Sequence, residues 1–497
     1  MSWLIGGISF LILGYFVYGR FVERLIPPDD RKTPCVAHPD GVDYVPLPKW
    51  KNMLIQLLNI AGVGPVIGVI AGIKFGKVAL LIIPVGCVLM GAVHDFFAGM
   101  ISIRMDGANL PKIVRDLLGR RYATVFSWMT ILLLLLVVAV FINVPANLVD
   151  SQWFPDASCF WFVVGVIFAY YIAATLFPVD AIIGRVYPIF GALLMIGSVA
   201  VFAAVVWAVI GNPALLEEGA EFVKYKTDVF NANGRSPIFP LLFVTIACGI
   251  ISGFHGTQSP IVARTIKSER EARVTFYGMM IAEGVIAMIW ASAALAIYNM
   301  QPASLAKSPA VVLGEIASRF LGPWMGGVAV FAIVVLAVTS GDTALRSARL
   351  SLSEMAGIGQ VKLTSRILTS LPLIAIVVGF LWWSNLSAKS FGHLWNYFAW
   401  GNQVLSATTL MAASVWLFRL GRGWRTLVTL IPGLFMTTVV ASFILWTSSD
   451  KGQPWGLVPG GLPLAAAIAL GAVIAVVFAA WVWVRGHKPA DGGAGAR

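Results

Sequence analysis

The chain contains 497 residues, of which 59% are hydrophobic and only 12% are charged. Soluble globular domains carry about 25% charged residues, so this composition excludes a soluble enzyme, a disordered chain and a disulfide-stabilised scaffold. The formal net charge is +12. In a membrane protein such an excess indicates cytoplasmic loops rich in Lys and Arg, and no nucleic-acid partner is expected.

Thirteen apolar segments are long enough to cross a bilayer, which takes about 20 mostly apolar residues in a helix. The first segment lacks the basic start and the small-residue cleavage site of a signal peptide, so we expect it to remain as a span. The sequence therefore predicts an all-α polytopic membrane protein with about 13 transmembrane helices. The predicted spans cover residues 2–18, 53–73, 78–103, 122–143, 159–178, 186–210, 238–260, 275–299, 323–341, 366–383, 393–418, 426–447 and 461–484.

Basic residues alternate between the two ends of these predicted spans. The segments after spans 1, 3, 5, 7, 9 and 11, together with the C-terminal tail and Arg366 at the start of span 10, contain 26 of the 35 Lys and Arg residues, and the other loops contain 9. Because cytoplasmic loops are enriched in basic residues, this distribution predicts an outside N-terminus and a cytoplasmic C-terminus.

Two of the spans are interrupted by glycine and proline. Span 2 contains NIAGVGP at residues 59–65, and span 7 contains GIISGFHGTQSP at residues 249–260. Proline removes an amide donor and glycine loosens a helix, and inside a bilayer the freed backbone groups must meet protein, water or a ligand. Ser259 and Pro260 have the pattern of an N-cap followed by a first-turn proline. This pattern predicts that the second half-helix of span 7 starts there.

The spacing of the two breaks indicates an internal repeat. Five spans separate them, so the two interrupted helices run in opposite directions, as in transporters built from inverted repeats. We therefore expect spans 2–6 (residues 51–210) and spans 7–11 (residues 211–420) to be two inverted repeats. Residues 1–50 then form an extra N-terminal span with a cytoplasmic loop, and residues 421–497 form two extra spans with a short basic tail. Proline kinks without a functional role are the alternative.

The two breaks supply a candidate substrate site. Amides of an interrupted helix can hold a carboxylate, and neighbouring hydroxyl, amide and imidazole groups add donors. On the opposing broken helix, Asn59 is expected to hold the other end of the substrate or the coupling ion. The predicted substrate-binding residues are Asn59, Gly62, Gly64, Gly253, His255, Thr257, Gln258 and Ser259.

Ionisable side chains inside predicted spans are costly and indicate function. Glu283 in span 8 and Asp342 at the end of span 9 are candidate proton carriers. Each also has a structural interpretation, because Glu283 can cap a neighbouring helix and Asp342 can pair with Arg346.

A metal site is the second interpretation of buried polar residues. His94, Asp95 and His255 form a plausible ligand set, which would suit a metal-dependent membrane enzyme. The structural alternative is a His94–Asp95 pair that locks two spans together. The chain contains no HExxH motif and no complete P-loop, so ATP-driven transport by this chain alone is not expected.

Six motifs carry a family resemblance. In their order along the chain they resemble the carbon starvation protein A (CstA) family of bacterial inner-membrane transporters. The resemblance implies a place among the amino acid–polyamine–organocation carriers, whose LeuT-type fold has a 5+5 inverted repeat. The motifs are NIAGVGPVIG (59–68), GAVHDFFAGMISIRMDG (91–107), PVDAIIGRVYP (178–188), ISGFHGTQSPIVART (251–265), SGDTALRSARL (340–350) and FGHLWNYFAWGNQ (391–403).

The resemblance also implies a function. Members of the family are associated with peptide uptake during carbon starvation, and related members with pyruvate uptake. We therefore expect a non-enzymatic secondary transporter of the bacterial inner membrane that imports short peptides, with pyruvate or another small monocarboxylate as the alternative. A metal-dependent membrane enzyme and a non-transporting nutrient sensor are the alternatives from other classes.

LeuT-type carriers often hold a sodium ion between the first broken helix and the eighth helix of the repeat. The resemblance therefore implies an ion site between spans 2 and 9, where Thr339 and Ser340 offer hydroxyl oxygens. The expected partners are the substrate, a coupling proton or sodium ion, and membrane lipid. Apart from that ion and the candidate metal, the sequence implies no cofactor, and it does not indicate an oligomeric state.

Overall fold

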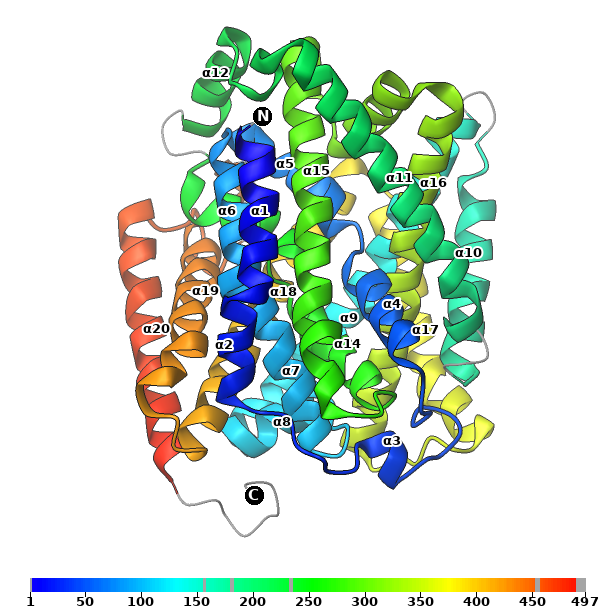
Figure 1. The fold of residues 1–497 in the computed structure, drawn as a ribbon, viewed down its shortest axis with the longest axis vertical. Coiled ribbons are helices and arrows are strands. Elements are labelled where there is room, and N and C mark those ends of the chain that lie inside the picture. Colours follow the sequence, from blue (N-terminus) through cyan, green and yellow to red (C-terminus); the bar gives the residue numbers. More distant parts are fainter. Residues whose placement is uncertain (1, 155–157, 179–182, 232–235, 452–455, 489–497) are drawn as a thin grey trace.

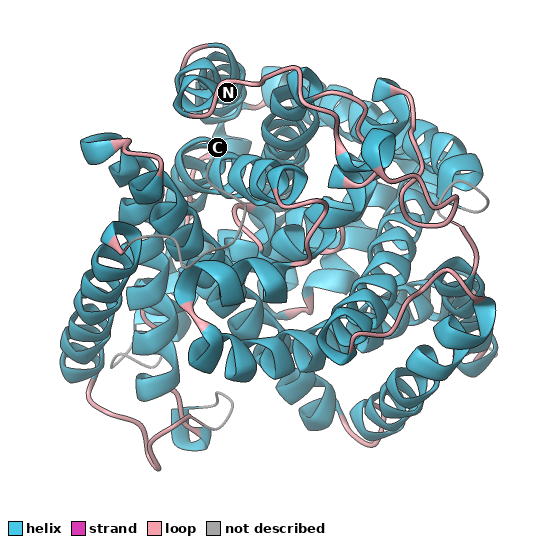
Figure 2. Ribbon diagram, turned by 90° about the horizontal axis from the view of Figure 1, so that it is seen from below, coloured by secondary structure: helices cyan, strands magenta, loops and turns pink. Residues whose placement is uncertain are grey.

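The computed structural model describes residues 2–154, 158–178, 183–231, 236–451 and 456–488. All regular secondary structure in these ranges is helical (Figure 2). The helices form a bundle in which the long elements run side by side along one direction (Figure 1). This arrangement confirms the all-α fold class expected from the composition.

Ten helices in the described ranges are long and apolar enough to cross a membrane, and the bent pair Lys49–Ile60 and Gly64–Phe75 makes an eleventh if it counts as one span. They coincide with eleven of the thirteen predicted spans. Predicted spans 5 and 11 are also helical, but α10 (Phe160–Leu176) has only 17 residues, and α18 (Ala388–Arg419) carries several polar residues. The chain is therefore a multi-pass membrane protein, and length and hydropathy alone establish ten or eleven spans.

The helical elements of the first half follow one another along the sequence. They are α1 (Ser2–Phe16), α2 (Tyr18–Leu25), α3 (Pro34–Ala37), α4 (Lys49–Ile60), η1 (Gly64–Gly68), α5 (Val69–Gly72), η2 (Ile73–Phe75), α6 (Val78–Gly86), η3 (Cys87–Gly91), α7 (Ala92–Arg104), α8 (Leu110–Leu118), α9 (Arg120–Trp153), α10 (Phe160–Leu176) and α11 (Ile183–Gly211).

The second half continues through the shorter elements around residues 213–249 into long helices. They are η4 (Pro213–Leu216), α12 (Ala220–Lys226), η5 (Thr227–Asn231), η7 (Ile238–Leu242), α13 (Phe243–Ile246), η8 (Ala247–Gly249), α14 (Gly253–Ala263), η9 (Glu269–Glu271), η10 (Arg273–Gly278), α15 (Met279–Met300), η11 (Pro302–Ala306), α16 (Pro309–Ala356), α17 (Leu363–Ser384), α18 (Ala388–Arg419), η12 (Gly423–Thr426), α19 (Leu427–Trp446), η13 (Ser449–Lys451) and α20 (Leu464–His487).

The long helices α9 and α16 pack against each other in the bundle. Gly322 interrupts α16 with a φ of 71°, a left-handed conformation that glycine adopts without a steric penalty. A short helix before Gly322 is thereby separated from the long stretch that begins at Pro323, where predicted span 9 begins. At one edge of the bundle, α19 and α20 pack on each other and on α18 (Figure 1).

The break in span 2 lies where the sequence predicts it. Helix α4 ends at Ile60, and the chain resumes helical structure at Gly64 after a bend of 49°. A methyl group on Gly64 would lie 2.6 Å from the Cβ atom of Cys248, and one on Gly249 would lie 3.0 Å from the Cα atom of Pro65. The two broken helices therefore touch at their breaks, and glycine permits the close approach.

The break in span 7 lies earlier than predicted. Its second half, α14, begins at Gly253 with Ser252 as the extended N-cap, and Pro260 lies inside the helix. The prediction that Ser259 and Pro260 start this half-helix is therefore wrong. The reason is tertiary, because the side chain of Asn402 on α18 accepts a hydrogen bond from the Phe254 amide at 2.7 Å. This bond satisfies one of the free amides at the start of a helix.

Candidate functional site

The last turn of α4 carries a buried amide at the centre of a polar network. Asn59 Oδ1 accepts hydrogen bonds from the hydroxyl of Tyr187 at 2.7 Å and from Thr343 Oγ1 at 2.9 Å. Its Nδ2 atom donates to Gln258 Oε1 at 3.4 Å. Asn59 thus joins predicted spans 2, 6, 7 and 9 at the point where span 2 breaks.

Gln258 extends this network to the helix before the break. Its Nε2 atom donates to Gln56 Oε1 at 2.8 Å, one turn before Asn59 on α4. All three amide side chains are fully buried, and Gln56 Nε2 forms no hydrogen bond. A buried amide donor without a partner is costly, so this atom is a donor that a ligand beside Gln258 and Asn59 could use.

Three other predicted residues of span 7 point elsewhere. Thr257 Oγ1 donates to the Phe254 carbonyl and Ser259 Oγ to the His255 carbonyl, both at 2.7 Å, so these hydroxyls are used within α14. His255 faces α7 and α15, as described below. The structure therefore brings Gln258 and Asn59 together, and it does not gather Thr257, Ser259 and His255 around them.

The predicted glycines serve close packing. A methyl group on Gly62 would lie 2.8 Å from Ser340 Oγ, and one on Gly253 would lie 2.2 Å from the carbonyl oxygen of Asn402. Asn402 also donates to Ser252 Oγ at 2.7 Å. The backbone at the start of α14 is therefore already held by α18, which Gly253 allows to approach.

The predicted ion-coupling hydroxyls meet the end of α4. Thr339 Oγ1 donates to the Leu58 carbonyl at 3.0 Å, and Ser340 Oγ donates to the Asn59 carbonyl at 2.8 Å. Two hydroxyl and two carbonyl oxygens thus gather between predicted spans 2 and 9. Oxygen ligands of this kind suit a hard cation.

Asp342 is fully buried and is held by three hydroxyl groups. Tyr170 donates to its Oδ2 atom at 2.7 Å. The Tyr187 and Thr343 hydroxyls lie 3.2 and 2.9 Å from Oδ1, and each shares its one proton between Asp342 and Asn59. It makes no ion pair with Arg346, whose guanidinium instead lies 2.8 Å from Asp43. The structural alternative for Asp342, a pairing with Arg346, is thus not what the fold shows.

Four ionisable side chains on α7, α14 and α15 form a connected row. His94 Nδ1 lies 2.8 Å from Asp95 Oδ1, and His255 Nδ1 lies 3.1 Å from Asp95 Oδ2. On its other side, His255 Nε2 lies 3.8 Å from Glu283 Oε2. All four side chains are buried, and both Glu283 oxygens and His94 Nε2 lack a hydrogen bond, so Glu283 caps no neighbouring helix.

The predicted metal ligands His94, Asp95 and His255 are three members of this row. Both histidines direct Nδ1 at the one carboxylate of Asp95, so the groups face each other instead of a shared centre. Among the described residues, no group of three or more His, Cys, Asp or Glu side chains is arranged to hold a metal ion. A bound metal remains a prediction that chemical analysis must test.

Sequence reasoning missed four residues that build the network: Gln56, Tyr170, Tyr187 and Thr343. Gln56 had a detectable signal, since it lies three residues before Asn59 inside an apolar span and therefore on the same helix face. Tyr170 had none, because a tyrosine in an apolar span is equally suited to packing. Tyr187 lies within the family motif at 178–188, which did not indicate its partners.

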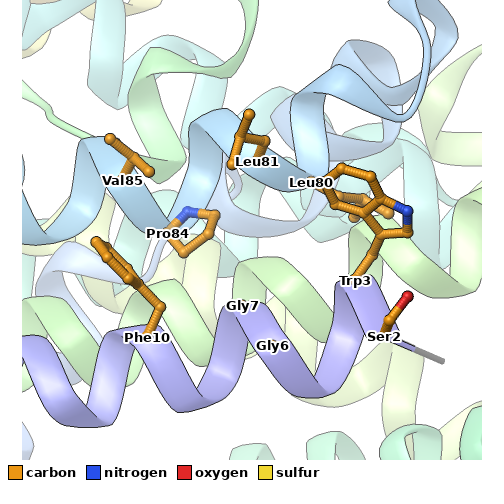
Figure 3. A pocket seen from close by; sticks show the side chains of 9 residues that line it. All are labelled: Ser2, Trp3, Gly6, Gly7, Phe10, Leu80, Leu81, Pro84 and Val85. Carbon is orange, nitrogen blue, oxygen red and sulfur yellow. The ribbon is translucent and has the colours of Figure 1, made fainter.

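Cavities in the described part of the bundle include one next to α9 and one next to α1. One, of about 670 Å³, lies among α9, α16, α17, α18 and the second half of span 2, and it contains several Asn and Ser side chains. The other, of about 400 Å³, lies between α1 and α6, where Phe10 points toward Pro84 and Trp3 toward Leu80 (Figure 3). The second cavity is almost entirely apolar and contains none of the predicted site residues.

Comparison with known families identifies the chain. The sequence model described as carbon starvation protein CstA matches residues 1–201, 162–321 and 305–442. This chain belongs to the CstA family. The family resemblance carried by the six motifs is therefore confirmed.

Relatives in the CstA family include a peptide transporter CstA of Campylobacter jejuni, 24% identical over 87% of this chain and 78% of the relative. The pyruvate/proton symporter BtsT of Escherichia coli is 26% identical over 58% of this chain and 48% of the symporter. An uncharacterized membrane protein of Haemophilus influenzae is 42% identical over 60% of this chain and 92% of its own length.

Solved structures show the fold of this CstA family member. The manganese transporter of Eremococcus coleocola aligns with a TM-score of 0.52 at 14% identity, covering 90% of this chain and 98% of the transporter. MhsT in complex with L-phenylalanine aligns with a TM-score of 0.54 at 15% identity, covering 89% and 99% of the two chains. At this identity the likeness establishes the LeuT-type transporter fold and nothing about substrate.

Proposed function

We propose that this secondary membrane transporter imports short peptides across the bacterial inner membrane, driven by a coupled proton or sodium ion. The observation that carries the proposal is the contact of two interrupted helices inside a fully buried polar network. Transporters with this fold bind substrate where their discontinuous helices meet. The family relatives named as peptide transporters support the substrate class.

The best-supported place for the substrate carboxylate is beside the side-chain amides of Gln56, Gln258 and Asn59. Gln56 Nε2 is a buried donor without a partner, and a carboxylate needs donors. Gln258 bridges the other two amides, so a ligand there contacts both broken helices at once. This assignment keeps two of the predicted residues and drops the hydroxyls of Thr257 and Ser259, which bond within their own helix.

Uptake into liposomes that contain the purified chain tests the substrate class. Labelled dipeptides and tripeptides should accumulate with saturable kinetics when a proton or sodium gradient is imposed. Pyruvate is the second candidate, favoured by the E. coli relative, and it should be measured in the same vesicles. No saturable uptake or counterflow of either class would contradict the proposal and favour a non-transporting sensor.

A substitution at the crossing tests the site. Gln258→Ala removes the bridge between Gln56 and Asn59, and a lost bond to a charged group costs about 1.5–3 kcal/mol. We expect substrate affinity to fall roughly tenfold to more than a hundredfold. Gln301→Ala is the matched control, because Gln301 is an exposed amide just after α15 and should bind substrate as the unchanged chain does.

Two structural features support different coupling ions. The row of side chains from His94 through Asp95 and His255 to Glu283 suits proton transfer. The hydroxyl oxygens of Thr339 and Ser340, together with the α4 carbonyls, suit sodium. Uptake that is insensitive to sodium and abolished by a protonophore would eliminate the sodium version. The symporter relative is named for proton coupling, and we therefore propose the proton first.

Orientation and metal content need separate tests. We propose an outside N-terminus and a cytoplasmic C-terminus from the loop charges; the C-terminal tail at 489–497 lies outside the described residues. A fluorescent protein fused to the C-terminus should fluoresce, whereas a periplasmic phosphatase fused there should be inactive. Elemental analysis of the purified chain decides whether a metal accompanies His94, Asp95 and His255.

A further inference from the structure

The cavity of about 670 Å³ lies next to the broken helix of span 2. Ile67 and Ala71, from the half of that span after the break, form part of its wall, and the first turn of α16 at Pro309 forms another part. Its volume falls within the roughly 300–1,000 Å³ of small-molecule sites in proteins. The cavity therefore borders the second half of the broken span 2, and it has room for a ligand larger than a small monocarboxylate.

Amide side chains from three helices converge on this cavity. Asn143 and Asn147 lie one turn apart on α9, Asn385 follows the end of α17, and Asn396 lies on α18. Asn143 is buried and donates to Ser384 Oγ at 3.0 Å. It therefore links α9, which carries Asn147, to the end of α17, which Asn385 follows.

The hydrogen bonds of two amides leave their carbonyl oxygens free. Asn147 Nδ2 donates to the Asn143 carbonyl at 2.9 Å, and Asn385 Nδ2 donates to the Leu381 carbonyl at 2.8 Å. Because the backbone carbonyls can only accept, these bonds identify the nitrogen of each amide. The Oδ1 atoms of Asn147 and Asn385 accept no bond from the described chain, and Asn396 makes none with its side chain. The cavity thus offers free acceptors.

The unpaired acceptor oxygens of Asn147 and Asn385 favour a ligand that carries a hydrogen-bond donor. A peptide group has an N–H that can donate to them and a C=O that can accept from an amide such as Asn396. A monocarboxylate anion could accept from the serine hydroxyls of the cavity, but it has no donor and would leave the Asn147 and Asn385 oxygens without a hydrogen bond. The polar lining therefore matches the backbone of a short peptide better than it matches pyruvate.

We propose that this cavity is an outer binding site for the backbone of a short peptide, held by Asn147, Asn385 and Asn396. The inference rests on the proposed function and narrows its substrate class. Ile67, three residues after Gly64, lines the cavity together with Pro309 at the start of α16. A peptide in the cavity therefore lies beside the second half of the broken span 2, on the side where α16 begins.

Equilibrium binding to the full chain in lipid nanodiscs tests this site. The probes are labelled tri-alanine, the same tripeptide with one amide replaced by an ester, and pyruvate. Asn147→Leu and Asn396→Leu should each weaken tri-alanine binding about two- to tenfold, since a neutral hydrogen bond contributes roughly 0.5–1.5 kcal/mol. Gln301→Leu, an exposed amide outside the cavity, should leave it unchanged.

The ester probe separates a direct bond from a general disturbance. The ester probe lacks the peptide N–H that donates to Asn147, so it should bind the unchanged chain more weakly than tri-alanine does. The Asn147→Leu variant should bind the two probes equally, because the same bond is already lost. If the unchanged chain binds tri-alanine and both Asn variants bind it equally well, the outer site is wrong while the proposed function stands. If the unchanged chain binds no peptide, the peptide function and the outer site both fail.

Discussion

Two buried carboxylates differ in the number of donors that surround them. Tyr170 donates a hydrogen bond to Asp342 alone, and Tyr187 and Thr343 share their single hydroxyl protons between Asp342 and Asn59. These donors stabilise an ionised carboxylate. Both oxygens of Glu283 lack a hydrogen bond, and His255 Nε2 lies 3.8 Å away. An unpaired charge in a buried position is costly, so Glu283 is the carboxyl group for which gaining or losing a proton requires the smallest rearrangement of partners.

We therefore predict that Glu283→Gln, which mimics the protonated acid, uncouples transport from the proton gradient. Exchange of labelled for unlabelled substrate should persist, whereas accumulation driven by an imposed pH gradient should fall at least tenfold. Both are measured in the same liposomes. Accumulation equal to that of the unchanged chain would remove Glu283 from the coupling mechanism.

Asp342→Asn serves as the comparison. The substituted amide keeps one acceptor oxygen and places an NH2 group against hydroxyl donors, so it disrupts the network around Asn59. We expect this variant to lose exchange as well as accumulation, which distinguishes a role in the binding network from a role in coupling alone.

Among the elements, the contact between the two breaks depends on small residues. An added methyl group on Gly64 would lie 2.6 Å from Cys248 Cβ and 2.7 Å from the Cys248 carbonyl oxygen. Because backbone cannot move aside as a flexible side chain does, overpacking here should cost about 1–3 kcal/mol. Gly64→Ala is expected to lower the thermal unfolding midpoint in detergent and to reduce uptake together.

Gly165→Ala is the matched control for this substitution. Gly165 is an exposed residue within α10, and a methyl group there meets nothing within 4 Å. Alanine favours a helix over glycine by roughly 0.5–1 kcal/mol, so this variant should be as stable as the unchanged chain or slightly more stable. Equal unfolding midpoints for Gly64→Ala and the unchanged chain would show that the contact between the two breaks has room for an added methyl group.

Across the whole molecule, a buried ion cluster ties the loop before α4 to α16. Asp43 lies 2.8 Å from Arg346 and 3.5 Å from Arg349, and Arg346 also donates to the carbonyls of Ala174 and Phe177 at the end of α10. Burial alone would raise the pKa of Asp43, but the surrounding arginines outweigh it and hold that pKa below its usual value. The cluster therefore joins three distant segments at one end of the bundle.

Asp43→Asn should destabilise the folded chain strongly, since it leaves buried cations unpaired, at a cost of about 3–5 kcal/mol. The pKa of Asp43 is lower in the folded than in the unfolded chain, so its stabilisation is complete above the unfolded value of about 3.9 and disappears as pH falls through the folded value. The difference in unfolding midpoint between the two chains should be constant from pH 5 to 8 and should shrink below about pH 4.

Asp30→Asn provides the control at the surface. Asp30 and Arg270 form an ion pair with side chains that are 84% and 70% exposed, and exposed pairs contribute less than about 1 kcal/mol. Its midpoint should stay near that of the unchanged chain. A similar loss in both variants would indicate a general charge effect and not the buried cluster.

The sequence by itself determined the membrane fold, the two broken helices and the family. These features are carried by local properties, namely the length of apolar runs and the backbone chemistry of glycine and proline. It also placed Thr339 and Ser340 against span 2, because the family motifs carry that relation.

Only the tertiary structure decided where the broken half of span 7 begins and which polar residues meet. Asn402 starts α14 at Gly253 from a helix about 150 residues away, so no local pattern could place that start. His255 and Gln258 are three residues apart, yet His255 meets Asp95 and Glu283 whereas Gln258 meets Gln56 and Asn59. A buried polar side chain must pair with whatever partner the packing brings within about 3 Å, and that partner depends on the relative rotation of separate helices, which the order of residues along one helix does not specify.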